Sequence, residues 1–170
     1  MKAFNIFIST LIFFISSLAN ANEKIKFSLD WKFEGPSAIF LTSKERGYYK
    51  SSGLDVTIDS GKGSRDAIPK VASGTYPLGF ADINSVIKFL DQNPKAKVKA
   101  IMMVYDRPPF AIIGRKSLGV AKPKDLEGKI LGAPAPDGAY AQWKSFVKAN
   151  NINASKVKIE NVGFPVREPM

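Results

Sequence analysis

Apolar and polar residues alternate along this chain in two different periods, and the two periods follow one another. Residues 24–29 and 54–58 alternate side chain by side chain, which is typical of β-strands. Between them, a helix is predicted from Gly35-Pro36 to Arg46-Gly47, because proline suits a first helical turn and a basic turn followed by glycine suits a last one. Strands that alternate with helices in this way predict an α/β fold with a mostly parallel sheet.

Predicted helices and strands continue to alternate beyond residue 60. A second helix is expected with Ser64 as its N-cap, then a strand over 78–81, and then a helix that ends near Asn93. Residues 98–105 form the longest apolar run after the N-terminal segment and therefore predict a buried strand. The remaining expectations are strands over 110–113, 129–133 and 156–162, a turn over 123–126 and a helix over 138–150.

A break at Asp106-Arg107-Pro108-Pro109 separates two apolar stretches. Consecutive prolines favour an extended, stiff connection. We therefore expect the chain to cross here between two lobes, residues 22–106 and 107–170. An ordinary loop within one domain is the alternative. The sequence then stops at Met170 soon after a predicted strand, so we expect the second lobe to be incomplete and the chain to be truncated.

The first 21 residues have the pattern of a cleaved signal peptide. Lys2 precedes an apolar run over 4–18, and Ala19-Asn20-Ala21 provides the small residues that signal peptidase requires. A membrane anchor is the alternative, but it needs about 20 continuous apolar residues. The chain has no cysteine, so it lacks the residue that carries a lipid anchor. We expect a protein that is free in the periplasm.

Composition excludes several kinds of chemistry. The chain contains neither histidine nor cysteine, which rules out Ser-His-Asp hydrolysis and zinc sites built from imidazole or thiolate. The net charge is +10, but the lysines are scattered and form no stripe with aromatic residues. We therefore expect a solvated basic surface, no nucleic-acid partner, no metal and no cofactor.

Polar and aromatic residues follow the predicted strands, where ligands of open α/β sheets bind. Trp31 either stacks on a flat ligand or packs between strand and helix. Arg65 either pairs with an anionic group or faces solvent. Asp82 and Asn84 either orient a ligand amine or cap the next helix. Tyr105 and Asp106 lie at the expected hinge, and the backbone N–H groups of residues 135–139 precede a helix in the second lobe.

Several segments of the chain resemble solute-binding proteins of the sulfonate, taurine, nitrate and thiamine-pyrimidine group, and the resemblance runs from Ile25 to the last residue. The segments include Leu29-Asp30-Trp31, Gly47-Tyr48-Tyr49, Gly53-Leu54-Asp55-Val56, Gly63-Ser64-Arg65-Asp66, residues 78–84, residues 104–110 and Arg167-Glu168-Pro169-Met170.

The resemblance implies the two-lobed fold of type II periplasmic binding proteins, with the ligand between the lobes. It implies a small-molecule ligand, delivery to an ABC permease at the inner membrane, and a monomer without catalytic activity. Members of the group are considerably longer than this chain. Combined with the positions after the strands, the motifs give these candidate ligand-binding residues: Trp31, Ser64, Arg65, Asp82, Asn84, Tyr105, Asp106, Asp137, Gly138 and Arg167, with Glu168 as a further candidate.

The same group includes an enzyme, the thiamine pyrimidine synthase, and this is the alternative function. It makes hydroxymethylpyrimidine phosphate from pyridoxal phosphate and one of its own histidines, and it holds the cofactor on a lysine. By motif, the histidine position corresponds here to Ser85 and the lysine position to Ala81. The resemblance therefore implies that the synthase chemistry is absent.

The candidate residues leave the ligand open. Asp82 and Asp106 favour a ligand with amine or amide donors, such as an aminopyrimidine. Arg65 and the helix N-termini favour an anionic end, such as a sulfonate or carboxylate. Taurine, or a pyrimidine that carries a phosphate, satisfies both.

Overall fold

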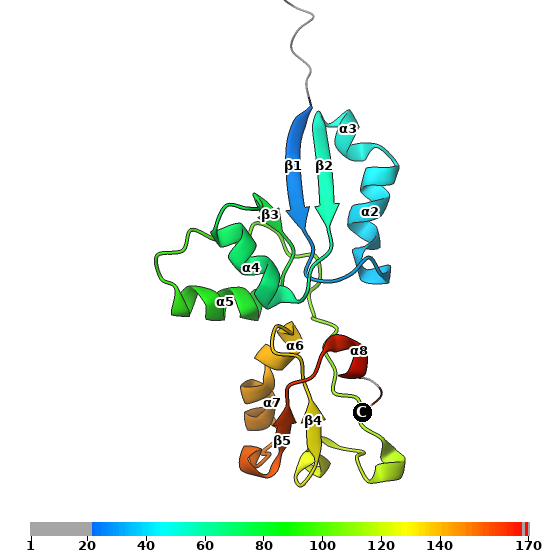
Figure 1. Cartoon of the computed structure of the whole chain (residues 1–170), viewed down its shortest axis with the longest axis vertical. Coiled ribbons are helices and arrows are strands. Elements are labelled where there is room, and N and C mark those ends of the chain that lie inside the picture. Colours follow the sequence, from blue (N-terminus) through cyan, green and yellow to red (C-terminus); the bar gives the residue numbers. More distant parts are fainter. Residues whose placement is uncertain (1–21, 168, 170) are drawn as a thin grey trace, which may run out of the picture.

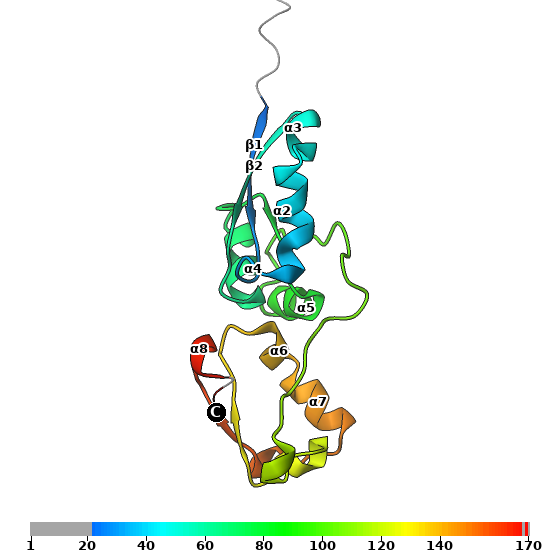
Figure 2. The same ribbon diagram turned by 90° about the vertical axis from the view of Figure 1, so that its right-hand side faces the viewer.

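A computed structural model of the chain describes residues 22–167 and residue 169, so the expected leader and Glu168 lie outside the described residues. The chain forms two separate parallel sheets, each flanked by helices, and an extended segment runs from one sheet to the other (Figures 1 and 2). The expectation of an α/β fold with parallel sheets is confirmed. None of the helices in the described part of the chain is long and apolar enough to cross a membrane.

The first sheet has three parallel strands in the order β2-β1-β3. Strand β1 (Glu23–Ser28) pairs along its whole length with β2 (Leu54–Asp59), whereas β3 (Leu78–Gly79) pairs only with the last two residues of β1. The two long strands have the predicted alternation. The third is shorter than the predicted range of 78–81.

Helices cover this sheet and end at the predicted signals. Gly47 has a φ of 73°, a left-handed conformation that favours glycine, and it separates the two helices that lie beside β2. The helical elements are η2 (Gly35–Ser37), α2 (Ala38–Glu45), α3 (Tyr48–Ser51), α4 (Ser64–Ala72) and α5 (Ile83–Gln92). Phe40 of α2 packs against Phe27 and Phe80, with ring centroids 4.9 and 5.2 Å apart, above buried Val56 and Ile58.

The second sheet has two parallel strands, β4 (Ile130–Gly132) and β5 (Lys158–Glu160). Its core contains buried Leu126, Ile152 and Val157. The helix predicted over 138–150 is divided at Gln142 into two helices. The helical elements here are η3 (Lys116–Leu118), η4 (Pro123–Leu126), α6 (Gly138–Ala141), α7 (Trp143–Ala149), η5 (Ala154–Lys156) and α8 (Phe164–Arg167).

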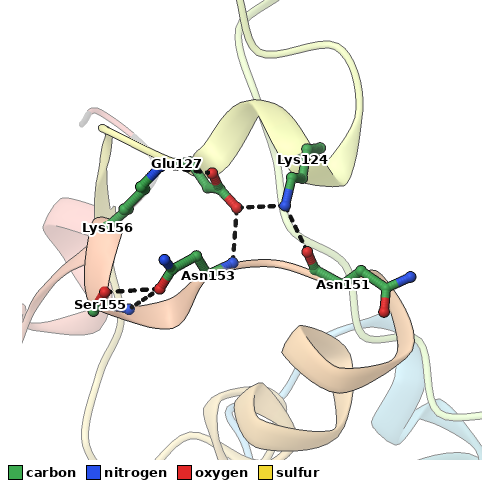
Figure 3. Close-up of polar contacts among 6 residues, drawn as sticks. All are labelled: Lys124, Glu127, Asn151, Asn153, Ser155 and Lys156. Atoms are coloured by element: carbon green, nitrogen blue, oxygen red, sulfur yellow. Dashed lines mark hydrogen bonds and ion pairs between the residues drawn. The ribbon is translucent and has the colours of Figure 1, made fainter.

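A network of polar contacts holds the end of the second sheet that lies far from the first (Figure 3). Glu127 accepts hydrogen bonds from Lys124 Nζ and from the backbone N–H of Asn153, both at 2.7 Å, and Lys156 Nζ lies 3.8 Å away. Lys124 also donates to the carbonyl oxygen of Asn151 at 2.6 Å. We call this group the distal network. It connects η4 to the turns before and within η5.

The segment between the sheets does not form the predicted strands. No residue from 97 to 114 is in a β-strand, and the predictions for 98–105 and 110–113 are wrong. Ile101 is 79% exposed and Ile113 is 84% exposed. An apolar run indicates a buried strand only where another strand is available to pair with it, and within the described residues none pairs with this segment. Val104 packs against the first core, and the ring of Tyr105 lies edge-on to Phe80 with centroids 5.9 Å apart.

Candidate functional site

The two sheets meet where helix starts from each side face one another (Figures 1 and 2). The first sheet contributes the end of β1 and the starts of α4 and α5, and the second contributes the start of α6. We call this region the junction. It comprises Asp30, Gly63, Ser64, Asp82, Ser85, Pro136, Asp137, Gly138 and Gln142.

Glycine allows the backbones of the two sides to approach closely. Gly63 has a φ of 110°, and a Cβ atom on it would collide with the carbonyl group of Pro136. On the opposite side, a Cβ atom on Gly138 would lie only 3.0 Å from Ser64 Oγ. The backbone N–H of Arg65 points to the carbonyl oxygen of Pro136 at 3.4 Å. Larger residues at these two positions would push the sides apart.

Ser64 is the link between three helix starts, and its predicted role as an N-cap is wrong. The N-cap of α4 is Gly63, and the Ser64 side chain makes no capping bond. Its buried hydroxyl instead accepts the backbone N–H of Asp82 at 3.0 Å and lies 3.5 Å from Asp30 Oδ2. The sequence does not distinguish these roles, because serine at a helix start serves either of them.

Of the two residues that were candidates for capping this helix, Asp82 is the N-cap of α5, whereas Asn84 lies inside the helix. The Asp82 carboxylate accepts the backbone N–H of Ser85 at 2.7 Å and the side-chain amide of Gln142 at 3.2 Å. The contact with Gln142 crosses from the first sheet to the second. Asn84 is exposed, and its amide donates to Asp82 at 3.4 Å.

Asp137 has the corresponding position at the start of α6. Its carboxylate accepts the backbone N–H of Ala139 at 2.9 Å and forms an ion pair with Arg167 at 2.8 Å. The backbone N–H groups expected to face a ligand here have partners within the chain, because those of Ala135 and Ala139 donate to side chains. Gly138 thus lies beside Ser64 of the first sheet, and Arg167 is linked to this region through its ion pair with Asp137.

Asp30 is a junction residue that sequence reasoning did not select, as are Ser85 and Gln142. Burial raises the pKa of the Asp30 carboxyl group to about 6, with smaller contributions from the carboxylates of Asp82 and Asp137. Hydrogen bonds from the backbone N–H of Asp30 itself and from Ser64 oppose this rise. None of the described lysine or arginine residues forms an ion pair with Asp30. Its position directly after β1 and before Trp31 was the signal that could have identified it.

The other predicted site residues differ in where they lie. Arg65 does not point to an open anion site, since its guanidinium donates to the carbonyl oxygen of Ala135 at 2.7 Å. Trp31 packs edge-on against Phe164 of α8, with ring centroids 4.2 Å apart. Tyr105 donates to the carbonyl oxygen of Pro36 at 2.8 Å. Asp106 is exposed and has no hydrogen bond or ion pair with a described residue.

The junction does not have the composition of a metal centre. Within the part of the chain that the structure describes, no group of three or more acidic side chains is arranged to hold a metal ion. The junction presents carboxylates and hydroxyls, which bind through hydrogen bonds and charge.

The family of this chain is assigned by its sequence. The model of the family described as NMT1/THI5 like matches residues 36–170. The chain belongs to this family, which confirms the resemblance found in its motifs.

Two curated relatives are named as binding proteins. The formylaminopyrimidine-binding protein of Halalkalibacterium halodurans is 27% identical over 172 residues, covering 96% of this chain and 52% of the relative. The riboflavin-binding protein RibY of Chloroflexus aurantiacus is 24% identical over 129 residues, covering 75% of this chain and 36% of the relative. The chain thus spans about half of one relative and about a third of the other.

A solved structure supports the fold. A protein from Bordetella bronchiseptica RB50 superimposes with a TM-score of 0.54 at 24% identity, over 82% of this chain and 44% of that one. At this level of identity the likeness concerns the fold alone.

Proposed function

We propose that the chain acts as the substrate-binding component of an ABC importer for a small organic solute. Membership of the NMT1/THI5 like family and two relatives named as binding proteins support a substrate-binding role. The observation that carries the proposal is the junction. Three helix starts from two separate sheets place polar side chains around Ser64, an arrangement suited to holding a small polar molecule.

In this proposal the two sheets belong to the two lobes of a type II binding protein, residues 22–106 and 107–170, and the ligand lies between them. The segment around Asp106-Arg107-Pro108-Pro109 is the hinge. It is extended and lies between the sheets in the chain, which fits a connection that bends while the lobes move as bodies.

The proposed location is the periplasm, with residues 1–21 removed as a signal peptide and the protein free of a lipid anchor. An ABC permease in the inner membrane is the proposed partner, and the protein acts as a monomer.

The proposal excludes catalysis. The synthase reaction consumes a histidine of the protein, and this sequence has none.

Isolation of the chain from periplasmic extract tests both location and binding. We expect Asn22 as the first residue by mass spectrometry and a stoichiometric small molecule that is released on denaturation. Retention of Met1 in the membrane fraction contradicts the location. Absence of any released compound, together with no binding across a panel of sulfonates, pyrimidines and flavins, contradicts the binding role.

Trp31 provides a second test at the junction. If its ring contacts ligand, Trp31→Ala weakens binding of the released compound by about 1–3 kcal/mol in calorimetric titration. Trp143→Ala is the matched control, because Trp143 packs against the core of the second sheet. Equal loss in both variants would mean that the ring supports the fold and not the ligand.

A further inference from the structure

The two sheets have separate hydrophobic cores. The residues packed around Phe40 in the first core and those packed around Leu126 in the second have no described member in common. Parts of a chain that do not share a core move relative to one another unless a large apolar interface holds them together. The position of one sheet against the other therefore depends on the contacts that cross the junction and on the segment that connects the sheets.

The connecting segment is anchored to each sheet by different residues. Tyr105 donates to the carbonyl oxygen of Pro36 at 2.8 Å beside the first core, whereas Ile112 and Val120 pack against the second core. Residues 106–111 lie between these anchors and form neither helix nor strand. Bending in this short stretch moves one sheet against the other without disturbing either core. The contacts across the junction then decide which position is populated.

Arg65, at the start of α4, makes two polar contacts with the second sheet. Its guanidinium donates to the carbonyl oxygen of Ala135 at 2.7 Å, and its backbone N–H points to the carbonyl oxygen of Pro136 at 3.4 Å. The neighbouring Gly63 has no side chain to hold α4 away from Pro136. A hydrogen bond from a charged donor is roughly twice as strong as one between neutral groups. One residue of the first sheet thus holds two consecutive carbonyl groups of the second.

Two further contacts across the junction join side chains only. The neutral amide of Gln142 donates to Asp82 at 3.2 Å, and the ring of Trp31 lies edge-on to Phe164. A side chain can rotate away from its partner while the two sheets keep their positions. The carbonyl groups that Arg65 holds belong to the backbone directly before α6, so this contact fixes α6 itself against α4.

We propose that Arg65 is a positioning residue for closure of the two sheets around a ligand: it holds the Ala135 and Pro136 carbonyl groups against α4 and thereby sets the fraction of closed molecules, without contacting the ligand. The inference deepens the proposed function and rests on its two-lobe interpretation. When the binding-competent arrangement is only partly populated, affinity falls in proportion to that fraction. Arg65 therefore contributes to the affinity for every ligand of the junction, whatever the charge of the ligand.

Single-molecule fluorescence energy transfer measures the closed fraction without a ligand. The chain has no cysteine, so Lys88→Cys and Lys144→Cys provide the two labelling sites, one exposed on α5 and one exposed on α7. Their separation reports closure, because α5 lies against α6, the helix directly before α7. The labelled full chain is dialysed to remove bound small molecules, and none is added. We expect the closed arrangement to give the main population of transfer efficiencies.

Two substitutions of Arg65 test its role. Arg65→Ala is expected to lower the ratio of closed to open molecules about 10-fold, the effect of losing one hydrogen bond from a charged donor. Arg65→Lys keeps the charge but replaces the forked guanidinium by a single ammonium group, so a fall of about 3-fold is expected. Arg46→Ala is the matched control, because it removes the same charge and Arg46 donates to Tyr48 of its own sheet at 3.4 Å. Its ratio should equal that of the parent.

The outcomes separate this inference from the proposed function. If the ratio in Arg65→Ala matches that of the parent, the inference is wrong and the binding role stands. An equal fall in Arg46→Ala also overturns the inference, because the loss then follows from charge alone. If the isolated chain releases no compound and binds nothing in the panel of sulfonates, pyrimidines and flavins, the proposed function is wrong, and the inference falls with it even where the ratio changes as expected.

Discussion

The pKa values of two carboxyl groups in this protein shift in opposite directions when the chain folds. Glu127 in the distal network has Lys124 at 2.7 Å and the backbone N–H of Asn153 at 2.7 Å, and these contacts lower the pKa of its carboxyl group. Asp30 at the junction is surrounded by other carboxylates, and burial raises its pKa to about 6. The first carboxylate contributes to the fold. The second destabilises it when ionised, which is typical of residues arranged for binding.

The two ends of the second sheet also differ in where their polar side chains find partners. At the distal end, every charged group drawn in Figure 3 contacts an oppositely charged or polar group of the same sheet. At the junction end, side chains reach across to the first sheet, as Gln142 does to Asp82. Changes at the junction should therefore affect both sheets and their ligand, whereas changes in the distal network should affect stability only.

The largest change in the free energy of unfolding is expected from Gly63→Ala. The new Cβ atom would meet the Pro136 carbonyl group, and alanine is strained at a φ of 110°. We expect a loss of about 4 kcal/mol in the free energy of unfolding, from strain together with displacement of Pro136. Urea denaturation measures it. Gly119→Ala is the control, because Gly119 has a φ of 75° but open space around it, so only about 1 kcal/mol should be lost there. Equal losses would show that the close approach is unimportant.

A smaller change in the free energy of unfolding, this time an increase in stability, is expected from Asp30→Asn. The pKa of Asp30 is raised from 3.8 to about 6 on folding, so the native protein loses stability as pH rises from about 4 through 6. Asparagine does not titrate and still accepts the hydrogen bond from Ser64. The variant should therefore be more stable than the parent by about 2–3 kcal/mol at pH 8, with the difference disappearing near pH 4. Urea denaturation across this range decides it, and a difference that does not change with pH would contradict the pKa assignment.

The smallest effect is expected from Glu127→Gln. A lowered pKa means that Glu127 stabilises the fold above its ordinary pKa of 4.5 and loses that contribution as pH falls through the lowered value. The variant should be slightly less stable than the parent at pH 7 and should match it at low pH, in thermal unfolding. Glu160→Gln serves as the control, because Glu160 lies 3.9 Å from Lys158 at the surface and should change little. The stability difference between Glu127→Gln and the parent should change with pH in the opposite direction to that of Asp30→Asn. Similar changes in both variants would contradict the opposite pKa shifts of the two carboxyl groups.

The sequence correctly predicted the helices and strands whose signals lie within their own residues. Strands β1 and β2 alternate because each has one buried face, and helices α2 and α5 end at glycine or before proline, where the backbone cannot continue. The run over 98–105 has the composition of a buried strand but no partner within the described residues, so composition alone gave the wrong answer. Pairing depends on distant parts of the chain, which periodicity does not report.

The sequence predicted that several candidate residues lie near one another, but it did not predict their contacts. Ser64 and Asp82 lie together because strand ends and helix starts collect at one edge of the first parallel sheet, and Asp137 comes from the second sheet. The role of Arg65 could not be predicted, since its partner is a backbone carbonyl 70 residues away in the sequence. Asp30 was not selected because its raised pKa depends on carboxylates that only the folded chain brings together.

The order of strands in the first sheet has a consequence for how the chain folds. Strand β1 is the first strand along the chain and the central strand of its sheet, with β2 and β3 pairing on either side. Both pairings are parallel, so each joins residues that are far apart in sequence, and such topologies fold slowly because a long loop must close first. As the chain is synthesised, β1 emerges early and must wait for Leu54 and then Leu78. Any factor that holds β1 during that interval delays formation of the whole sheet.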